Sequence, residues 1–279
     1  MKKTRYLSLF TAVLLLCGIL SACNSAPQSA GLCLPGLEWG QSVDEALTAL
    51  GASQEELGED FYSETGGSSY AILRDQEVFG QKSAEIMLLF GSAYASPENT
   101  QETVSTLTQV TISYPDDADM DAVLAEMKKS FGEPAETVET YSTYDELPTE
   151  YTSDDNNQYW AGPAIREAVD GEHQKTLRET EEFAAALGMP EEYDTAIDDA
   201  IWENYLKTPV STARRSTNYV SPTKALVSEE EWEQLQEEMG FIEYPNTVVL
   251  DGALAVNTDA DYIDIVRSLQ EANASSASE

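Results

Sequence analysis

The chain has 279 residues, of which 51 are acidic and 15 are basic, and its formal net charge at pH 7 is −36. This excess of acid excludes non-specific nucleic-acid binding and opposes adsorption to anionic lipid head groups, because both require lysine and arginine. The 42% hydrophobic content, with 14 tyrosines and 4 tryptophans, predicts a folded core rather than a disordered chain.

The N-terminus has the features of a secretion signal. Lys2, Lys3 and Arg5 form a short basic head, and residues 6–20 are almost free of polar side chains. A basic region followed by an apolar region of this length is typical of a signal peptide. The apolar region is too short for a transmembrane helix, which needs about 20 apolar residues.

The four residues that end this region, Leu20-Ser21-Ala22-Cys23, resemble the lipobox of bacterial lipoproteins. The resemblance implies that residues 1–22 are removed and that Cys23, as the first residue of the mature chain, is acylated, for example with palmitate. Lipid on Cys23 would anchor the protein in the cell membrane, facing the outside of the cytoplasm. The alternative is a soluble secreted protein cleaved after Ala22, in which Cys23 is an ordinary thiol.

The remaining cysteines cannot form an intramolecular disulfide. Cys17 leaves with the signal, an acylated Cys23 cannot pair, and only Cys33 is left as a thiol. Cys33 is either a buried thiol ahead of the first strand or a group that reacts or pairs with another molecule. Residues 24–31 are small, polar and contain proline and glycine, which predicts that residues 23–35 form a lipidated stalk.

Residues 36–140 are predicted to form an α+β domain. Ser42 and Glu45 have the spacing of a capping box, and the apolar residues behind them predict a helix that stops at Gly51. Strand-like runs follow at 70–80, 83–90 and 103–114, with a turn at 95–101, and a helix is predicted from about residue 118 to 131. This order predicts an antiparallel meander with packed helices.

The opening of this domain, with Trp39-Gly40 before the capped helix and the meander, resembles small modules of uncharacterised bacterial lipoproteins. Residues 37–51 carry the resemblance. They are also similar to the helix-then-sheet modules of outer-membrane assembly lipoproteins and of the β-lactamase inhibitor protein. These resemblances imply a binding or scaffolding role rather than catalysis.

The second half, residues 141–268, is predicted to be more helical and to pack on the first. Residues 141–158 are expected to form a loop and 159–161 a short strand, followed by two helices within 172–206 that break at Gly188. Pro190 would begin the second of these helices. A third helix is expected at 228–240, then a hairpin turning at Asp251-Gly252, a final strand or helix, and a disordered tail at 269–279.

Several templates for catalysis do not match the sequence. His173 is the single histidine, and it stands among charged residues with no nucleophile elbow nearby, so a Ser–His–Asp triad is not expected. A zinc site lacks ligands, and the glycine-rich phosphate-binding motifs are absent from the sequence. No cofactor or metal is therefore predicted.

Two acidic segments invite comparison with calcium loops. Asp117, Asp119 and Asp121 begin like such a loop, but Ala122 and Lys128 stand where glycine and glutamate are needed, so these acids are better explained by a helix N-terminus. The run 154–157 is a looser candidate for a cation. A pair of glycosidase carboxylates is not excluded, because such a pair is defined by separation in space.

The segment 207–224 contains four basic residues and no acidic one, unlike the rest of the chain. Arg214 and Arg215 are therefore candidates for an anion-binding loop that grips a phosphate or carboxylate. The alternative is that both arginines neutralise acidic neighbours.

The favoured hypothesis is a membrane-anchored, non-enzymatic lipoprotein that binds an unidentified extracytoplasmic protein or envelope component. Two alternatives are kept: a solute-binding lipoprotein of a transporter, which would show two alternating β/α lobes, and an envelope hydrolase with paired carboxylates. A cleft between lobes, two facing carboxylates, or a flat aromatic or basic patch would distinguish the three.

Overall fold

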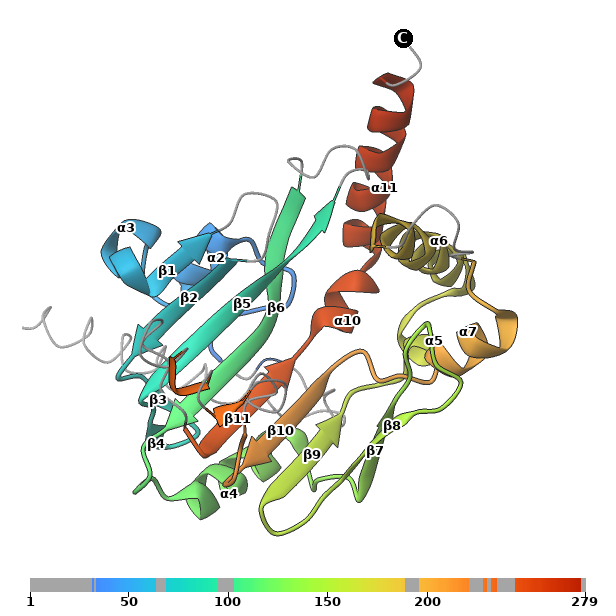
Figure 1. Cartoon of the computed structure of the whole chain (residues 1–279). Coiled ribbons are helices and arrows are strands. Elements are labelled where there is room, and N and C mark those ends of the chain that lie inside the picture. Colours follow the sequence, from blue (N-terminus) through green and yellow to red (C-terminus); the bar gives the residue numbers. More distant parts are fainter. Residues whose placement is uncertain are drawn as a thin grey trace, which may run out of the picture.

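The computed structural model describes residues 32, 34–63, 69–94, 103–188, 196–220, 228–229, 232–234 and 244–276. It shows the expected α+β fold, built on a seven-stranded antiparallel sheet (Figure 1). In spatial order the strands are β1 (Phe61–Ser63), β2 (Ser69–Arg74), β5 (Glu85–Tyr94), β6 (Thr103–Tyr114), β11 (Asn246–Asp251), β10 (Thr212–Ser216) and β9 (Asn157–Ala161).

The two halves of the chain share this sheet. Strand β6 pairs with β5 on one side and with β11, from near the C-terminus, on the other. Because β11 continues the pairing to β10 and β9, the sheet runs without interruption across the expected boundary at residues 140 and 141. The C-terminal half thus contributes strands to the sheet as well as helices.

One face of the sheet, here named the core face, carries the first hydrophobic core. Alternation along the strands places one side chain in two on this face, as the sequence predicts for Val110, Ile112 and Tyr114. Helices α2 (Val43–Ala49) and α4 (Met120–Phe131) contribute Leu47 and Met127 to the same core. The face on the other side of the sheet is named the opposite face.

Both helices of this core begin as the sequence predicts. The Ser42 hydroxyl accepts a hydrogen bond from the backbone of Glu45, whose carboxylate accepts one from the Ser42 backbone, so the capping box is present. Asp119 caps α4 by accepting a hydrogen bond from the backbone of Ala122 at 3.0 Å. This confirms that the acids at 117–121 serve a helix N-terminus.

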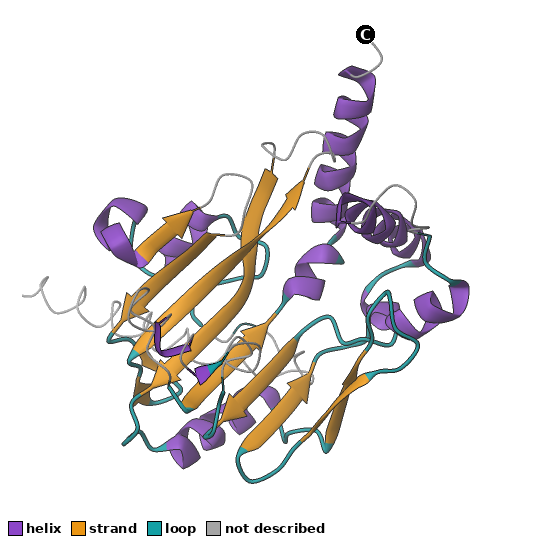
Figure 2. Cartoon of the chain, in the orientation of Figure 1, coloured by secondary structure: helices purple, strands orange, loops and turns teal. Residues whose placement is uncertain are grey.

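A second hydrophobic core lies beside one end of the sheet, where Figure 2 shows most of the helices of the C-terminal half. Leu177, Trp202 and Ile263 are among its buried residues. The helices around it are α5 (Ile165–Ala168), α6 (Gly171–Gly188), α7 (Asp199–Tyr205), α10 (Ala253–Asn257) and α11 (Ala260–Ser276). The expectation of a more helical second half is therefore correct in this region.

Two predicted segments differ in detail. The run 70–80 is not one strand, because β2 ends at Arg74 and a small hairpin of β3 (Glu77–Val78) and β4 (Gln81–Lys82) follows. The expected loop 141–158 contains β8 (Thr149–Thr152), which pairs with β7 (Thr137–Thr140). In both places short, mostly polar segments form two-stranded ribbons with one buried valine each, which composition alone does not distinguish from loops.

The predicted hairpin at Asp251-Gly252 is wrong. Strand β11 already has β6 and β10 on its two sides, so no edge is free for a returning strand. The chain instead turns into α10, and Asp251 Oδ1 accepts a hydrogen bond from the backbone of Ala253 at 3.0 Å. The undecided segment after it is the helix α11, which reaches into the expected tail as far as Ser276.

In the 172–206 region, helix α6 ends at Gly188 as expected, and α7 begins at Asp199 after its cap Asp198. Residues 196–198 are not helical, and Pro190, the predicted start of the second helix, lies outside the described residues. Of the predicted helix 228–240, residues 229 and 232–234 are helical and Trp232 is buried. The signal, Cys23, Cys33, the turn 95–101 and residues 230, 231 and 235–240 lie outside the described residues.

Candidate functional site: a pocket at the junction of sheet and helices

The two candidate anion-binding arginines are not in a loop and do not face each other. Both lie on β10, paired with β9 on one side and β11 on the other. Consecutive residues of a strand point to opposite faces, so Arg214 lies on the opposite face and Arg215 on the core face. The structure therefore does not bring them together to grip one anion.

Arg214 is held between aromatic rings. Its guanidinium lies 5.7 Å from the ring centre of Tyr159 and 5.2 Å from that of Tyr219, and Nη2 donates to Asn157 Oδ1 at 3.0 Å. The ring of Tyr151 on β8 continues this arrangement, 5.5 Å from that of Tyr159. The result is a small aromatic and basic patch at the β9 edge of the sheet, next to β8.

Arg215 is buried, with only 3% of its surface exposed. Its Nη1 donates to Gln158 Oε1 at 2.9 Å, and Nη2 lies 3.7 Å from the carboxylate of Asp121 on α4. Burial lowers the pKa of this guanidinium, which the charge of Asp121 partly offsets. These contacts favour the alternative that the sequence left open for this residue, namely pairing with an acidic neighbour.

The other candidates have local structural roles. Asp154 Oδ1 accepts hydrogen bonds from the backbones of Asn156 and Asn157, which lower its pKa, so this carboxylate holds a turn before β9. His173 Nδ1 lies 3.0 Å from Asp170 Oδ1, and this hydrogen bond raises the pKa of the imidazole. The side chain of His173 is 29% exposed.

A pocket of about 280 Å³ lies where the sheet meets the helical core. We name it the junction pocket. Elements far apart in the sequence build it, because the end of β7, the turn after α7, the start of β10 and the start of α10 meet there. Its lining includes Thr140, Tyr141, Tyr205, Thr208, Pro209, Val210, Ser211, Thr212, Asp251, Ala253 and Leu254.

Hydrogen bonds fix the wall that contains Tyr141. The Thr208 hydroxyl accepts a hydrogen bond from the Tyr141 backbone at 2.9 Å and donates one to its carbonyl oxygen at 3.1 Å. The Tyr141 hydroxyl donates to Glu139 at 2.8 Å, and this contact raises the pKa of the phenol. The ring of Tyr141 is therefore held by its backbone and by its hydroxyl.

Polar groups line the pocket next to these rings. Thr212 and Asp251 are directly opposite each other on β10 and β11, so their side chains share one face. Asp251 Oδ2 accepts a hydrogen bond from Gln109 at 3.3 Å. Ser211 is only 4% exposed, and its hydroxyl has no hydrogen-bond partner among the residues that the structure describes.

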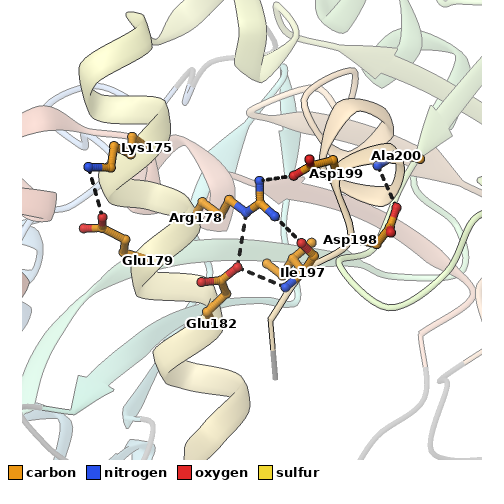
Figure 3. A network of polar contacts seen from close by, with 8 residues as sticks. All are labelled: Lys175, Arg178, Glu179, Glu182, Ile197, Asp198, Asp199 and Ala200. Atoms are coloured by element: carbon orange, nitrogen blue, oxygen red, sulfur yellow. Dashed lines mark hydrogen bonds and ion pairs between the residues drawn. The ribbon is translucent and has the colours of Figure 1, made fainter. Parts of the chain in front are cut away.

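An ion-pair network fixes the helices behind the pocket (Figure 3). Arg178 on α6 lies 3.1 Å from Glu182 and 2.8 Å from Asp199 of α7, and it also donates to the carbonyl oxygen of Ile197. Its guanidinium lies 5.8 Å from the ring centre of Trp202. This network joins α6 to α7, whose last residue, Tyr205, lines the pocket.

The sequence offered no signal for this site. Asp251 was assigned to a hairpin turn, and Ser211 and Thr212 were only polar neighbours of Arg214. In the part of the chain that the structure describes, no three or more His, Cys, Asp or Glu side chains are placed to hold a metal ion. Across the same described residues, no helix has the length and apolar character needed to cross a membrane.

The fold and the pocket define the chain as an α+β protein with one antiparallel sheet and a small site at its junction with a helical core. Comparisons with protein-family models, with curated proteins and with solved structures found no match.

Proposed function

We propose that this protein is a lipid-anchored, extracytoplasmic binding protein, held on the membrane through Cys23 and taking a small ligand in the junction pocket. The observation that carries the binding role is the pocket itself. Ligand sites form preferentially where separately packed units meet, and this pocket lies where the sheet meets the second hydrophobic core, whose residues Tyr205 and Val210 line it. The lipobox resemblance of residues 20–23 supports the location.

The two alternatives receive less support. A solute-binding protein of a transporter was expected to have two β/α lobes, whereas strands of both halves here join one antiparallel sheet. A hydrolase with paired carboxylates needs two acids in one cleft, and Asp251 is the single carboxylate among the described residues that line the junction pocket. The patch around Arg214 favours an additional contact with a partner surface.

The anchor is tested by acyl labelling in the producing cell. Labelled palmitate is expected in the wild-type chain and in Cys33→Ser, and it should be absent from Cys23→Ser, which should leave the membrane fraction. Cys33→Ser is a matched control because it removes the other cysteine of the mature chain. Label or membrane retention in Cys23→Ser would show that the anchor proposal is wrong.

The binding role is tested by thermal unfolding of the full chain with cationic, neutral and anionic small molecules. A ligand that binds only the folded protein, added at a free concentration 100 times its Kd, stabilises the protein by about 2.7 kcal/mol and raises its Tm. Thr212→Phe should fill the pocket and abolish the shift. Thr111→Phe, on the same face of the sheet but away from the pocket, should retain it. The binding role is contradicted if a ligand still raises the Tm of Thr212→Phe. It is also contradicted if no cationic, neutral or anionic compound raises the Tm of the wild-type protein.

A further inference from the structure

We propose that the junction pocket binds a small organic ammonium ion, with its charged group beside Asp251 and Thr212 and its apolar part against Tyr141 and Leu254. This inference rests on the binding role proposed above and adds the chemical class of the ligand.

Charge is the first reason. Asp251 is the single charged side chain among the described residues that line the pocket. Each of its carboxylate oxygens accepts one hydrogen bond, from Ala253 at 3.0 Å and from Gln109 at 3.3 Å. An ionised carboxylate has about four acceptor sites, so capacity remains for a ligand N–H group. An anion in the same position would be repelled.

An unused hydroxyl group is the second reason. The side chain of Thr212 lies directly across from Asp251 on the same face, and its hydroxyl has no partner within the described chain. An ammonium group offers three donors, which the Thr212 hydroxyl and the Asp251 carboxylate can accept together.

The apolar side chains that line the pocket suit a short hydrocarbon part of the ligand. Tyr141 offers an aromatic ring, and Pro209, Val210 and Leu254 offer apolar surface. The volume of about 280 Å³ is just below the usual range of about 300–1,000 Å³ for ligand pockets, which limits the ligand to a small amine.

The net charge of the whole protein also favours a cationic ligand. A net charge of −36 raises the local concentration of cations and lowers that of anions at low ionic strength. Lys207 opposes this effect. Its Nζ lies 5.6 Å from the ring centre of Tyr141, which lines the pocket, so its positive charge would repel an ammonium ligand. Replacing Lys207 with Gln is therefore expected to tighten ammonium binding.

The test compares three probes of similar shape by calorimetric titration of the full chain in detergent micelles at one ionic strength. The probes are phenethylammonium, neutral 2-phenylethanol and anionic 3-phenylpropanoate. Phenethylammonium should bind, the alcohol should bind about 10- to 100-fold more weakly because it lacks the charged hydrogen bond, and the anion should not bind.

The decisive variant is Asp251→Asn. The amide oxygen of the new side chain can still accept the hydrogen bond from the Ala253 backbone, and the Gln109 amide can rotate so that its oxygen accepts from the new amide group. The fold should therefore persist, which circular dichroism will check. The affinity for phenethylammonium should fall about 10- to 100-fold, while that for the alcohol should not change. Asp261→Asn makes the same change in net charge on the exposed side of α11 and should have no effect.

The outcomes separate this inference from the binding role. Tighter binding of the alcohol or the anion, with sensitivity to Thr212→Phe, overturns the ammonium class and leaves the binding role intact. Equal loss of affinity in Asp251→Asn and Asp261→Asn shows that net charge rather than the pocket attracts the amine. Failure of phenethylammonium to bind also overturns the inference, whatever the thermal assay finds with other compounds.

Discussion

The hydroxyl group of Tyr205 on α7 donates a hydrogen bond of 3.1 Å to the carboxylate of Glu181 on α6. Burial raises the pKa of Glu181, which this hydrogen bond partly offsets, and burial also raises the pKa of Tyr205. Tyr205 belongs both to the second hydrophobic core and to the lining of the junction pocket. The ionisation of one acid is thus coupled to the packing behind the pocket.

This pair predicts how stability depends on pH. Because the pKa of Glu181 is higher in the folded than in the unfolded protein, the folded state holds more protons between the two values. The contribution of Glu181 to the free energy of unfolding therefore falls as pH rises from its ordinary pKa through the raised one. Glu181→Gln keeps an acceptor for Tyr205 and should raise stability at neutral pH and flatten this part of the profile.

The measurement is urea unfolding at a series of pH values. Glu179→Gln is the control, because Glu179 is on the same helix, is 59% exposed and forms only a surface pair with Lys175 at 3.6 Å. It should leave the profile unchanged. An unaltered slope in Glu181→Gln would show that Glu181 does not titrate in this range.

Arg178→Ala should loosen the attachment of α6 to α7. The variant loses the contacts to Glu182, Asp199 and the Ile197 carbonyl, whose combined loss should cost about 2 kcal/mol of the free energy of unfolding. Lys175→Ala, which breaks one exposed ion pair, should cost less than about 0.5 kcal/mol. Denaturant unfolding compares them, and equal effects would show that the network in Figure 3 does not stabilise the fold.

Gly252→Ala should destabilise the link between β11 and α10. A Cβ atom at this position would lie 2.2 Å from the indole of Trp39, and a rigid ring in a packed core cannot easily move away. The expected loss is about 3 kcal/mol in the free energy of unfolding, measured by thermal unfolding. Gly171→Ala, at a helical position with no atom within 4 Å, should retain or gain up to about 1 kcal/mol. Similar stability of the two variants would contradict the close packing of Trp39.

Ser211→Ala and Ser83→Ala should have different effects although both serines are buried. The Ser83 hydroxyl donates to the Gln76 carbonyl at 3.0 Å, so its removal should cost about 1 kcal/mol. The Ser211 hydroxyl has no partner among described residues, so its removal should leave stability unchanged or slightly higher. Urea unfolding measures both. A large loss in Ser211→Ala would show that this hydroxyl is bonded in the native protein.

Several elements could be predicted from the sequence because their signals are local. The capping box of Ser42 and Glu45, the alternation in 103–114 and the apolar stripe of 120–131 each arise from residues within one or two turns of each other. Such patterns specify a helix or strand whatever surrounds them. The boundaries of β6 and α4 were correspondingly close to those observed.

The errors occurred where a distant partner decides the outcome. Asp251-Gly252 has the residues of a hairpin turn, but β6 and β10 occupy both sides of β11, and this pairing depends on strands more than 30 residues away in sequence. Arg214 and Arg215 are a basic pair in the sequence. Placing them in a strand instead of a loop sends their side chains to opposite faces.

By itself, the sequence determined the acidic charge, most helices and strands of the first half, and the expectation of a lipid on Cys23, because composition and short-range spacing carry these properties. Only the tertiary structure decided that both halves share one sheet and that Tyr141, Ser211, Thr212 and Asp251 surround one pocket. The physical reason is that a pocket is defined by separations in space, and chain folding brings together residues that no sequence spacing relates.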